Sequence, residues 1–266
     1  MDLSVIVLSY NTKEITDQCL IRLQLSVISC QTKLKNKIEV IVVDNASSDG
    51  SVEMIRKNHP WVKLIESKKN TGFSRGNNIG IKLAKNDYIL LLNSDALVEE
   101  NTLVDALEYF KNHGDCDILG PKLVFGDGIF QPSAGNLPTP SNIIYWIMGL
   151  SLIPGIKQST EPFHPNYQEF FTKERRVGWI SGAFFMAKKQ VFDTVGGFDE
   201  SIFMYLEEVE LCRRIKKAGF KIWYVPSIIV THLHGASSES NRASIFIHEL
   251  KGLKYYFEKH NPKKYY

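Results

Sequence analysis

The sequence predicts an α/β protein built on a doubly wound, mostly parallel open sheet, with a helical extension at its C-terminus. Short apolar runs rich in Val and Ile recur between turn residues, as expected for strands that are buried on both faces. In the first half of the chain these runs alternate with segments whose apolar residues have helical spacing. This alternation is typical of parallel strands joined by helical crossovers.

The first half of the chain contains four apolar strand runs separated by helical patterns. We expect strands at 5–8, 38–43, 62–65 and 88–92, and helices at 15–28, 51–58 and 77–84. After residue 112 the alternation breaks down, and 126–140 and 161–174 read as loop-rich segments with Pro and Gly.

Regular elements return at residue 177. We expect a buried strand with a glycine interruption at 177–187, a helix at 207–217, short strands at 220–224 and 228–231 around Pro226, and a terminal helix at 244–259. The predicted organisation is one domain over 1–240, with halves at 1–112 and 113–240, followed by a helix and basic tail at 241–266.

The composition is that of a globular protein. The 266 residues are 44% hydrophobic and 23% charged, which excludes wholesale disorder and a disulfide-dense miniprotein. The formal net charge of +3 is too small to indicate nucleic acid as the main partner, whereas a small anionic ligand is compatible with it.

Cysteine usage and the apolar segments give an expectation of location. The cysteines form no CxxC pair and have no histidine at zinc spacing, so we expect reduced core thiols and a cytosolic protein: Cys19, Cys30, Cys116 and Cys212. The first residues lack the pattern of a signal peptide. The longest apolar stretch, 142–156, is too short to span a bilayer, so no transmembrane helix is predicted.

Polar residues follow each of the first strands. Ligands of open α/β sheets bind beyond the carboxyl ends of the strands, so these residues are candidates for a binding site. They are Ser9-Tyr10-Asn11, the segment 44–50, the segment 70–78 and Asn93-Ser94-Asp95. For 47–50 the favoured alternative is that the residues only make a turn and cap a helix.

Phosphate-binding loops are missing from the sequence, because no GxGxxG follows the first strand and no GxxxxGK[ST] occurs. Two aspartates at strand ends have separate chemical roles available to them. Asp44 is suited to accept hydrogen bonds from a base or ribose, and Asp95 is suited to bind a hard divalent cation. For each, the alternative is an aspartate that only turns the chain.

Seven segments, in order, carry a family resemblance. They are SVIVLSYN (4–11), VIVVDNASSDGS (40–51), NTGFSRGNNIGI (70–81), YILLLNSDALV (88–98), WISGAFFMAKK (179–189), GGFDESIFMYLEEVELCRRIKKAGF (196–220) and VTHLHGAS (230–237). With these segments the chain resembles glycosyltransferase family 2, of the Rossmann-like GT-A type, and most closely its bacterial rhamnosyltransferase-like branch.

The resemblance implies a site for a nucleotide-sugar donor. It places these residues in or beside the nucleotide pocket: Ser9, Tyr10, Asn11, Asp44, Arg75 and Asn78. The family's metal motif falls on Asn93-Ser94-Asp95, with Asp95 as the carboxylate that contacts Mg²⁺ or Mn²⁺. A single carboxylate fits a cation that is bound mainly through the donor diphosphate.

The resemblance also implies a catalytic base. Inverting transfer needs a carboxylate that takes the proton of the acceptor hydroxyl. The family position falls on Glu208, in the pair Glu207-Glu208, where the family more often has Asp; Glu207 stays an alternative base. The alternative for this cluster is a solvated acidic helix face, which is the favoured interpretation of Glu210 with Arg214 four residues later.

Further positions follow from the same motifs. His232 matches a histidine that completes the metal site or contacts the diphosphate, and His234, on the same strand face, competes with it. Arg242 would reach the diphosphate. Gly182 and Ala183 would let the donor sugar and acceptor approach the backbone, with simple packing as an equal alternative.

The function implied is an inverting, metal-assisted sugar transfer from a nucleotide-diphosphate donor to a glycan or lipid-linked glycan in surface polysaccharide synthesis. dTDP-rhamnose is the favoured donor, and UDP- or GDP-sugars are close alternatives. Two other functions stay open: a nucleotide-sugar-binding protein with impaired catalysis, and a nucleotidyltransferase.

The acceptor side has one sequence signal. The stretch 142–156 and the terminal helix are apolar, and the last sixteen residues carry five Lys and one Glu, 5 − 1 = +4. This combination fits peripheral contact with an anionic membrane on its cytoplasmic side. A core helix followed by a solvated tail is an equal alternative.

Overall fold

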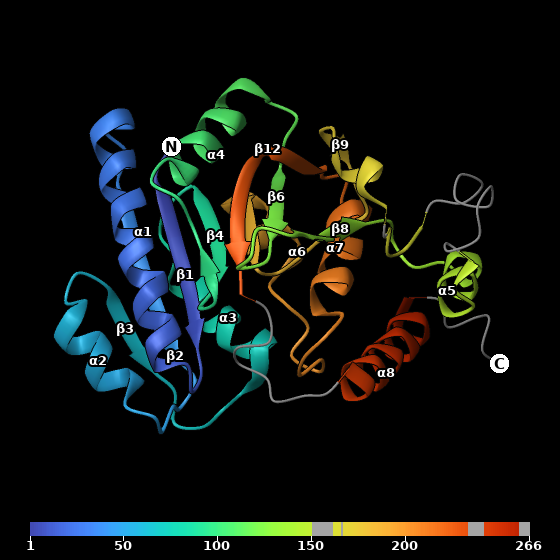
Figure 1. Ribbon diagram of the computed structural model, residues 1–266, viewed down its shortest axis with the longest axis horizontal. Coiled ribbons are helices and arrows are strands. Elements are labelled where there is room, and N and C mark those ends of the chain that lie inside the picture. The colour runs from blue at the N-terminus through green and yellow to red at the C-terminus, as the bar shows by residue number, and fades with distance from the viewer. Residues whose placement is uncertain (151–161, 166, 234–241, 261–266) are drawn as a thin grey trace.

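A central mixed sheet organises the molecule in the computed structural model, which describes residues 1–150, 162–165, 167–233 and 242–260. Its strands lie in the order β3 (Lys63–Glu66), β2 (Ile38–Asp44), β1 (Leu3–Ser9), β4 (Tyr88–Asn93), β11 (Phe184–Lys188), β6 (Ile118–Val124), β12 (Ile222–His232) and β5 (Ala96–Leu97). The first four are parallel, and β11 runs antiparallel to β4 and β6. The predicted doubly wound, mostly parallel sheet is confirmed (Figure 1).

Helices cover both faces of this sheet. One hydrophobic cluster joins it to α1 (Lys13–Leu34), α2 (Ser51–Asn58) and α4 (Thr102–Asn112). The other cluster joins it to α3 (Gly72–Leu83), α6 (Lys189–Val195), α7 (Glu207–Lys217) and α8 (Arg242–His260). The helix α5 (Pro140–Ile147) lies at the same end of the molecule as α8, far from α1 (Figure 1).

The central strands read as continuous apolar runs because both of their faces are covered. In β1, Val5 and Val7 pack in the cluster with α1, whereas Ile6 packs in the cluster with α7 and α8. A strand with one solvated face would instead alternate apolar and polar residues.

The elements expected in the first half are confirmed, with two extensions. α1 continues to Leu34, and α3 begins at Gly72 rather than Asn77. Gly72 has a φ of +79°, and the next residue, Phe73, donates its N–H to Phe203 O at 3.0 Å. This early start depends on a residue distant in sequence. Helices α4, α5 and α6 are not predicted by the sequence pattern.

The glycine interruption expected at 177–187 is confirmed, but the residues on its two sides do not belong to one strand. The segment forms β10 (Trp179–Ile180) and β11, and β10 pairs with β8 (Ala134–Gly135) in a separate two-stranded sheet. Between them Gly182 lies in a turn, in which the N–H of Ala183 donates to Ser181 Oγ at 3.2 Å. Glycine weakens a strand interior, and here it marks the break.

Two short strands around Pro226 are also a wrong expectation, because β12 is continuous through this proline. The register of β12 against β6 shifts between Val225 and Ile229. Proline has no N–H to donate to the ladder, so the strand bulges there instead of ending. The remaining short elements are β7 (Phe130–Gln131), β9 (Arg175–Arg176) and the 3₁₀ turn Gln168–Phe171.

The terminal helix is confirmed, but its apolar residues divide between core and surface. Leu253, Tyr256 and Phe257 are buried, so for them the core-helix alternative holds. Phe246 and Ile247 are exposed, and the side chain of Ile245 lies outside the described part. No helix among the described residues is both long and apolar enough to cross a bilayer. The four cysteines are buried and unpaired, as expected.

Two glycines let α3 approach the sheet closely. A Cβ on Gly76 would lie 2.5 Å from Leu8 Cδ1, and a Cβ on Gly80 would lie 2.3 Å from Ile6 Cγ2. Ile6 is β-branched and fully buried, so it cannot rotate away at low cost. The contact between α3 and β1 therefore requires glycine.

We expect Gly80→Ala to lower the free energy of unfolding by about 1–3 kcal/mol through overpacking, despite the better helix propensity of alanine. Urea denaturation measures this change. Gly114→Ala is the control, because no atom lies within 4 Å of the added Cβ. Equal stability of the two variants would contradict the close packing of α3.

Candidate active site

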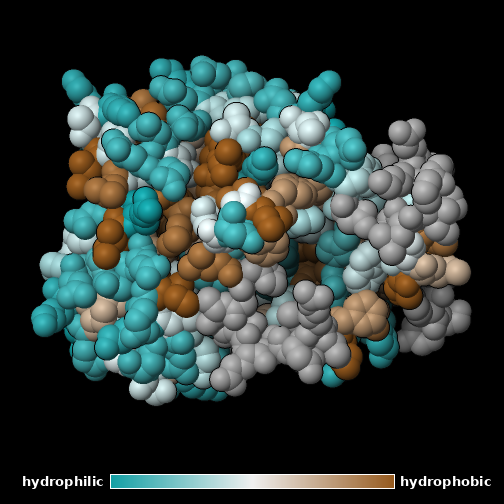
Figure 2. All heavy atoms as spheres, in the orientation of Figure 1, coloured by the Kyte–Doolittle hydropathy of each residue, from teal (hydrophilic) through white to brown (hydrophobic). Residues whose placement is uncertain are grey.

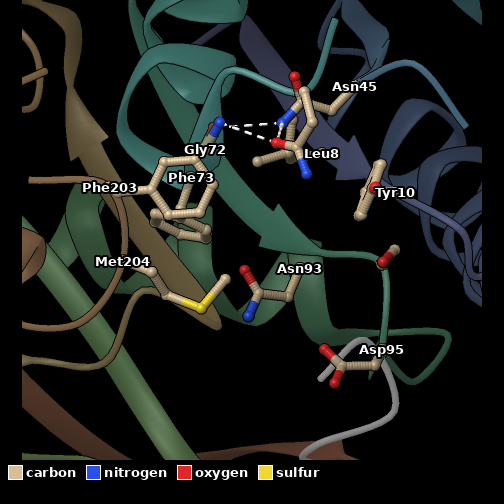
Figure 3. Close-up of a pocket in the computed structure, with 11 residues that line it drawn as sticks. Leu8, Tyr10, Asn45, Gly72, Phe73, Asn93, Asp95, Phe203 and Met204 are labelled. Atoms are coloured by element: carbon tan, nitrogen blue, oxygen red, sulfur yellow. Dashed lines mark hydrogen bonds between the residues drawn. The ribbon is translucent and has the colours of Figure 1, made fainter. Parts of the chain in front are cut away.

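Two adjoining cavities lie beyond the carboxyl ends of the parallel strands. They share Phe73, Asn93, Asp95 and Met204, so Asp95 lies at their junction. In the first cavity, Phe73, Phe203 and Met204 lie on one side and Tyr10 on the other, with Asn93 and Asp95 at one end (Figure 3). The second cavity has a volume of about 330 Å³ and extends to α7 and α8.

Asp44, at the end of β2, is almost fully buried at 1% exposure. Its Oδ2 accepts the N–H of Ser47 at 2.9 Å, whereas its Oδ1 is buried without a hydrogen-bond partner among the described residues. A buried carboxylate oxygen with no partner is costly, so a donor from a bound ligand would stabilise it.

The segment 47–50 has the contacts of a turn and a helix start. Asn11, with a φ of +50°, donates its N–H to Ser47 Oγ at 2.9 Å and accepts the N–H of Ser48 at 2.8 Å. Asp49 accepts the N–H of Ser51 at 3.0 Å at the start of α2. These contacts support the turn and capping alternative for this segment.

Asn45 belongs to the candidate segment 44–50, but the sequence reasoning gave it no role of its own. Its side chain accepts the N–H of Thr71 at 3.0 Å and donates to Asn70 Oδ1 at 2.9 Å and to Gly72 O at 3.3 Å. The amide thus ties the end of β2 to the start of α3, and it lines the first cavity (Figure 3). Its place directly after Asp44 at the strand end was the available signal.

Of the six residues that the resemblance placed in or beside the nucleotide pocket, only Tyr10 lines a cavity. Asn11 and Asp44, described above, and three further residues are absent from the lining of both cavities. Ser9 is fully buried and contacts Thr16 Oγ1 at 3.0 Å. Asn78 donates to Phe198 O at 2.9 Å and accepts the N–H of Phe198 at 2.8 Å. Arg75 is exposed, with Nε 3.6 Å from Glu200 Oε2. The structure therefore gives them supporting contacts around the site.

Asp95 faces His232 across the junction of the cavities. Asp95 Oδ1 lies 3.2 Å from His232 Nε2, and both side chains are buried. Gln131 Oε1 lies 3.1 Å from His232 Nδ1, which orients the ring with Nε2 toward Asp95. Gln131 lies on the two-residue strand β7, and no sequence signal indicated it.

The two ligand types of this pair fit a divalent cation, since carboxylate oxygen and imidazole nitrogen both bind Mn²⁺. Among the described residues no cluster of three or more Asp, Glu, His or Cys side chains is arranged to hold a metal. A cation held here would therefore need further ligands from a substrate. Asn93 and Ser94 line the first cavity beside Asp95. His234 and the side chain of Arg242 lie outside the described part.

Glu207 and Glu208 begin α7 and line the second cavity. The residues before them, Tyr205 and Leu206, have left-handed φ values of +70° and +72°. This turn directs the start of α7 into the cavity, opposite Gly182 and Ala183, which line it as well. Glu207 Oε2 and Glu208 Oε2 are each buried without a hydrogen-bond partner among the described residues.

Burial changes the acidity of this pair. Desolvation, and then the charge of Glu208, raise the pKa of Glu207 well above its usual value. Desolvation, and to a lesser extent the charge of Glu249, raise the pKa of Glu208 to about 7. Near neutral pH Glu208 can therefore exchange a proton, and burial favours the protonated form of Glu207.

Glu210 was expected to be solvated, and this expectation is wrong, because its side chain is fully buried. Its carboxylate accepts Arg214 Nε at 2.9 Å and Lys259 Nζ at 2.7 Å, so it joins α7 to α8. Arg214 also donates to Val195 O at 2.6 Å. Burial opposes ionisation, but hydrogen bonds from Arg214 and Lys259 prevail and lower the pKa of Glu210.

The Rossmann-like sheet, with a polar rim leading to a cavity lined by four carboxyl groups, is the arrangement that the resemblance to glycosyltransferases implied. The chain belongs to glycosyl transferase family 2, whose family model matches residues 4–196. A second model, glycosyltransferase like family 2, matches residues 166–245.

Curated relatives agree with this assignment. The chain is 29% identical over 220 residues to the N-acetylglucosaminyl-diphospho-decaprenol L-rhamnosyltransferase of Mycobacterium tuberculosis, covering 78% of this chain and 70% of the relative. It is 27% identical over 190 residues to the rhamnosyltransferase WbbL of Escherichia coli, covering 68% and 67%.

Solved structures share the fold. The mannosyltransferase PcManGT of Pyrobaculum calidifontis, in complex with GDP-Man and Mn²⁺, superposes with a TM-score of 0.63 at 17% identity, over 97% of this chain and 63% of that one. TarS of S. aureus, in complex with UDP-GlcNAc, superposes with a TM-score of 0.61 at 19% identity, over 98% and 68%.

We expect Glu210→Gln to destabilise the protein by about 1–3 kcal/mol, because half-buried Arg214 and exposed Lys259 lose the counter-charge of the fully buried carboxylate. Since folding lowers the pKa of Glu210 from its usual 4.5, its contribution is present above that pH and is lost on acidification. The difference between variant and wild type should therefore shrink as the pH falls below this value.

Thermal and urea unfolding at several pH values measure this difference. Glu258→Gln is the matched control, because Glu258 forms an exposed pair with Lys254 on α8 at 3.3 Å, worth about 0.5 kcal/mol or less. A loss for Glu210→Gln no larger than that of the control would show that the buried pairs do not stabilise the fold.

Proposed function

We propose that the chain is an inverting glycosyltransferase that moves a sugar from a nucleotide-diphosphate donor to a glycan or lipid-linked glycan acceptor. The observation that carries the proposal is the junction of the two cavities at Asp95. A donor in the first cavity and an acceptor beside Glu208 in the second would meet there. Residues 1–112 would bind the nucleotide, and 113–240 would bind the acceptor.

dTDP-rhamnose is the donor that we favour, with UDP- and GDP-sugars as alternatives. The support is that two similar proteins are named rhamnosyltransferases, whereas the structural neighbours hold GDP-Man and UDP-GlcNAc. Tyr10 borders the first cavity, and the unpartnered Asp44 Oδ1 lies at the adjacent strand end. We propose that this oxygen accepts a hydrogen bond from the base or ribose.

Asp95 and His232 would hold Mg²⁺ or Mn²⁺ together with the donor diphosphate, because a carboxylate oxygen and an imidazole nitrogen can both bind such an ion. The cation would neutralise charge on the leaving nucleotide diphosphate. Asn93 and Ser94 would contact the donor beside it. The N–H of Asn93 donates to Ala183 O at 3.0 Å, which holds the motif against β11.

Glu208 would act as the base. In one displacement, the acceptor oxygen forms a bond to the anomeric carbon, the bond from that carbon to the diphosphate oxygen breaks, and the hydroxyl proton passes to Glu208. The pKa of about 7 suits Glu208 to this role at neutral pH, whereas the raised pKa of Glu207 favours a carboxyl group that hydrogen-bonds the acceptor. In this proposal Glu208, with its longer side chain, serves as the base at the position where the family more often has Asp.

We also propose peripheral contact with the inner face of the plasma membrane. Exposed apolar side chains lie on α5 and α8: Ile144, Ile147, Met148, Phe246 and Ile247. Figure 2 shows apolar side chains at this end of the molecule. The Trp146 ring, 5.6 Å from that of Phe246 and 5.2 Å from that of His164, connects this apolar surface with the second cavity.

Charge supports the membrane contact less than the sequence indicated. Lys259 contacts Asp199 at 2.6 Å and Glu210 at 2.7 Å, and Lys254 pairs with Glu258. These lysines are therefore partly neutralised within the protein, and residues 261–266 lie outside the described part. The apolar surface is the main support.

We expect a nucleotide sugar of one class, with Mn²⁺ or Mg²⁺, to stabilise the protein by about 2.7 kcal/mol at 100 times its Kd. Asp95→Asn should abolish the metal-dependent part, and chelation should do the same. Glu208→Gln should keep donor binding and lower transfer about 10²–10⁴-fold. Thermal shift and product formation measure these effects.

Asp193→Asn on α6, an exposed residue paired with Lys189, is the control for loss of one acidic side chain. Donor binding without transfer by the wild type toward any glycan tested would favour a binding protein with impaired catalysis. Lack of response to every nucleotide sugar would overturn the proposed function.

For the membrane contact, we expect Ile144→Asp and Met148→Asp each to weaken binding to phosphatidylglycerol vesicles about tenfold, through loss of apolar burial. Sedimentation with vesicles measures the bound fraction. Ile21→Asp and Leu25→Asp are controls, because these residues are similarly exposed on α1, at the opposite end of the molecule (Figure 1). Equal weakening by both sets would contradict a defined membrane-binding surface.

A further inference from the structure

A hydrogen-bonded pair that no motif indicated lies in the same cavity as the two α7 carboxyl groups. His164 Nε2 and Glu249 Oε1 are 2.6 Å apart, and both residues line the second cavity with Glu207 and Glu208. Glu249 lies on α8, in the C-terminal extension, and His164 lies in the short described segment before residue 166.

Aromatic side chains hold the imidazole in place. The His164 ring centroid is 4.0 Å from that of Phe163, 5.1 Å from that of Trp179 and 5.2 Å from that of Trp146. Trp179 is itself fixed, since its Nε1 donates to Phe163 O at 3.0 Å. The Glu249 side chain is 18% exposed, so water screens the pair only in part.

α8 is anchored so that Glu249 keeps this position. Lys259 contacts Asp199 and buried Glu210, and Tyr255 Oη donates to Asp199 Oδ2 at 2.7 Å. Tyr256 is fully buried against α7. The pair is therefore a fixed part of the cavity wall.

The charge of this pair acts on Glu208. Glu249 carries a negative charge that opposes ionisation of Glu208, in addition to the larger effect of burial. A protonated His164 would cancel much of that charge. Other titratable groups lie around Glu208. Glu207 and Cys212 share α7 with it, and Asp95 and His232 line the same cavity. His248 on α8 contacts the ring of Tyr205, which precedes α7.

We propose that His164 and Glu249 are a positioning pair that sets the electrostatic environment of Glu208 and so the pH range in which Glu208 accepts the proton of the acceptor hydroxyl. The role of Glu208 in this statement rests on the proposed function. The charge coupling between the pair and Glu208 does not, so it can be tested without donor or acceptor.

The test is a ¹³C NMR titration of protein labelled at the glutamate carboxyl carbon, with the Glu208 signal assigned by its loss in Glu208→Gln. Glu249→Gln removes a negative charge and should lower the midpoint of Glu208 by about one pH unit. His164→Gln replaces the imidazole by a neutral amide, leaves Glu249 beside no group that can take up a positive charge and should raise the midpoint. Glu258→Gln, on the same helix in an exposed pair, should leave it unchanged.

Shifts of opposite sign in the two variants support the proposal, because a loss of packing would not reverse sign. An unchanged midpoint in both variants, or shifts of the same sign, would overturn it. If either variant fails to fold, Glu249→Asp, which keeps the charge, should retain the wild-type midpoint, and a fall like that expected for Glu249→Gln would overturn the proposal.

The pH profile of transfer separates this inference from the proposed function. If Glu208→Gln abolishes transfer but the midpoints do not move, the positioning pair is wrong and the base is retained. If the midpoints move as expected while Glu208→Gln transfers normally, the base assignment fails and with it the catalytic part of this proposal.

Discussion

The parallel pairing of β1 with β2 and β4 is the constraint on which the site depends. Ser9 lies opposite Asp44, and Leu8 lies opposite Asn93, so the three strands end at nearly the same level. A one-residue register shift would exchange the side chains that pack in the two hydrophobic clusters, and the close packing of both clusters opposes such a shift. The buried strands thereby determine where the polar residues of the rim lie.

The antiparallel part of the sheet adds further residues to the site that begins at the ends of the parallel strands. β12 ends beside β5, with His232 opposite Ala96, which brings the imidazole next to Asp95. β11 lies between β4 and β6 and presents the turn at Gly182 to the second cavity. The two halves of the chain therefore meet along the sheet, and the junction of the cavities follows from its topology.

Sequence reasoning located site residues that belong to a motif of neighbours in the chain. Asp95 comes shortly after β4 and Glu208 lies in the first turn of α7, and both line the cavities. It failed where partners come from afar: Gln131 and Glu249 reach the site only through tertiary packing. Asn78 was expected beside the nucleotide. The sequence around it does not show that its side-chain amide forms hydrogen bonds with the backbone of Phe198.

The left-handed residues before α7 have a consequence for the order of the site before any substrate arrives. Conformations of this kind cost non-glycine residues about 1–3 kcal/mol each and persist only where surrounding packing determines them. Glycines would relieve this cost but would give the loop many more accessible states. Tyr205 and buried Leu206 restrict the backbone of this loop to few conformations. The carboxyl groups at the start of α7 are therefore positioned when the protein folds rather than when a substrate binds.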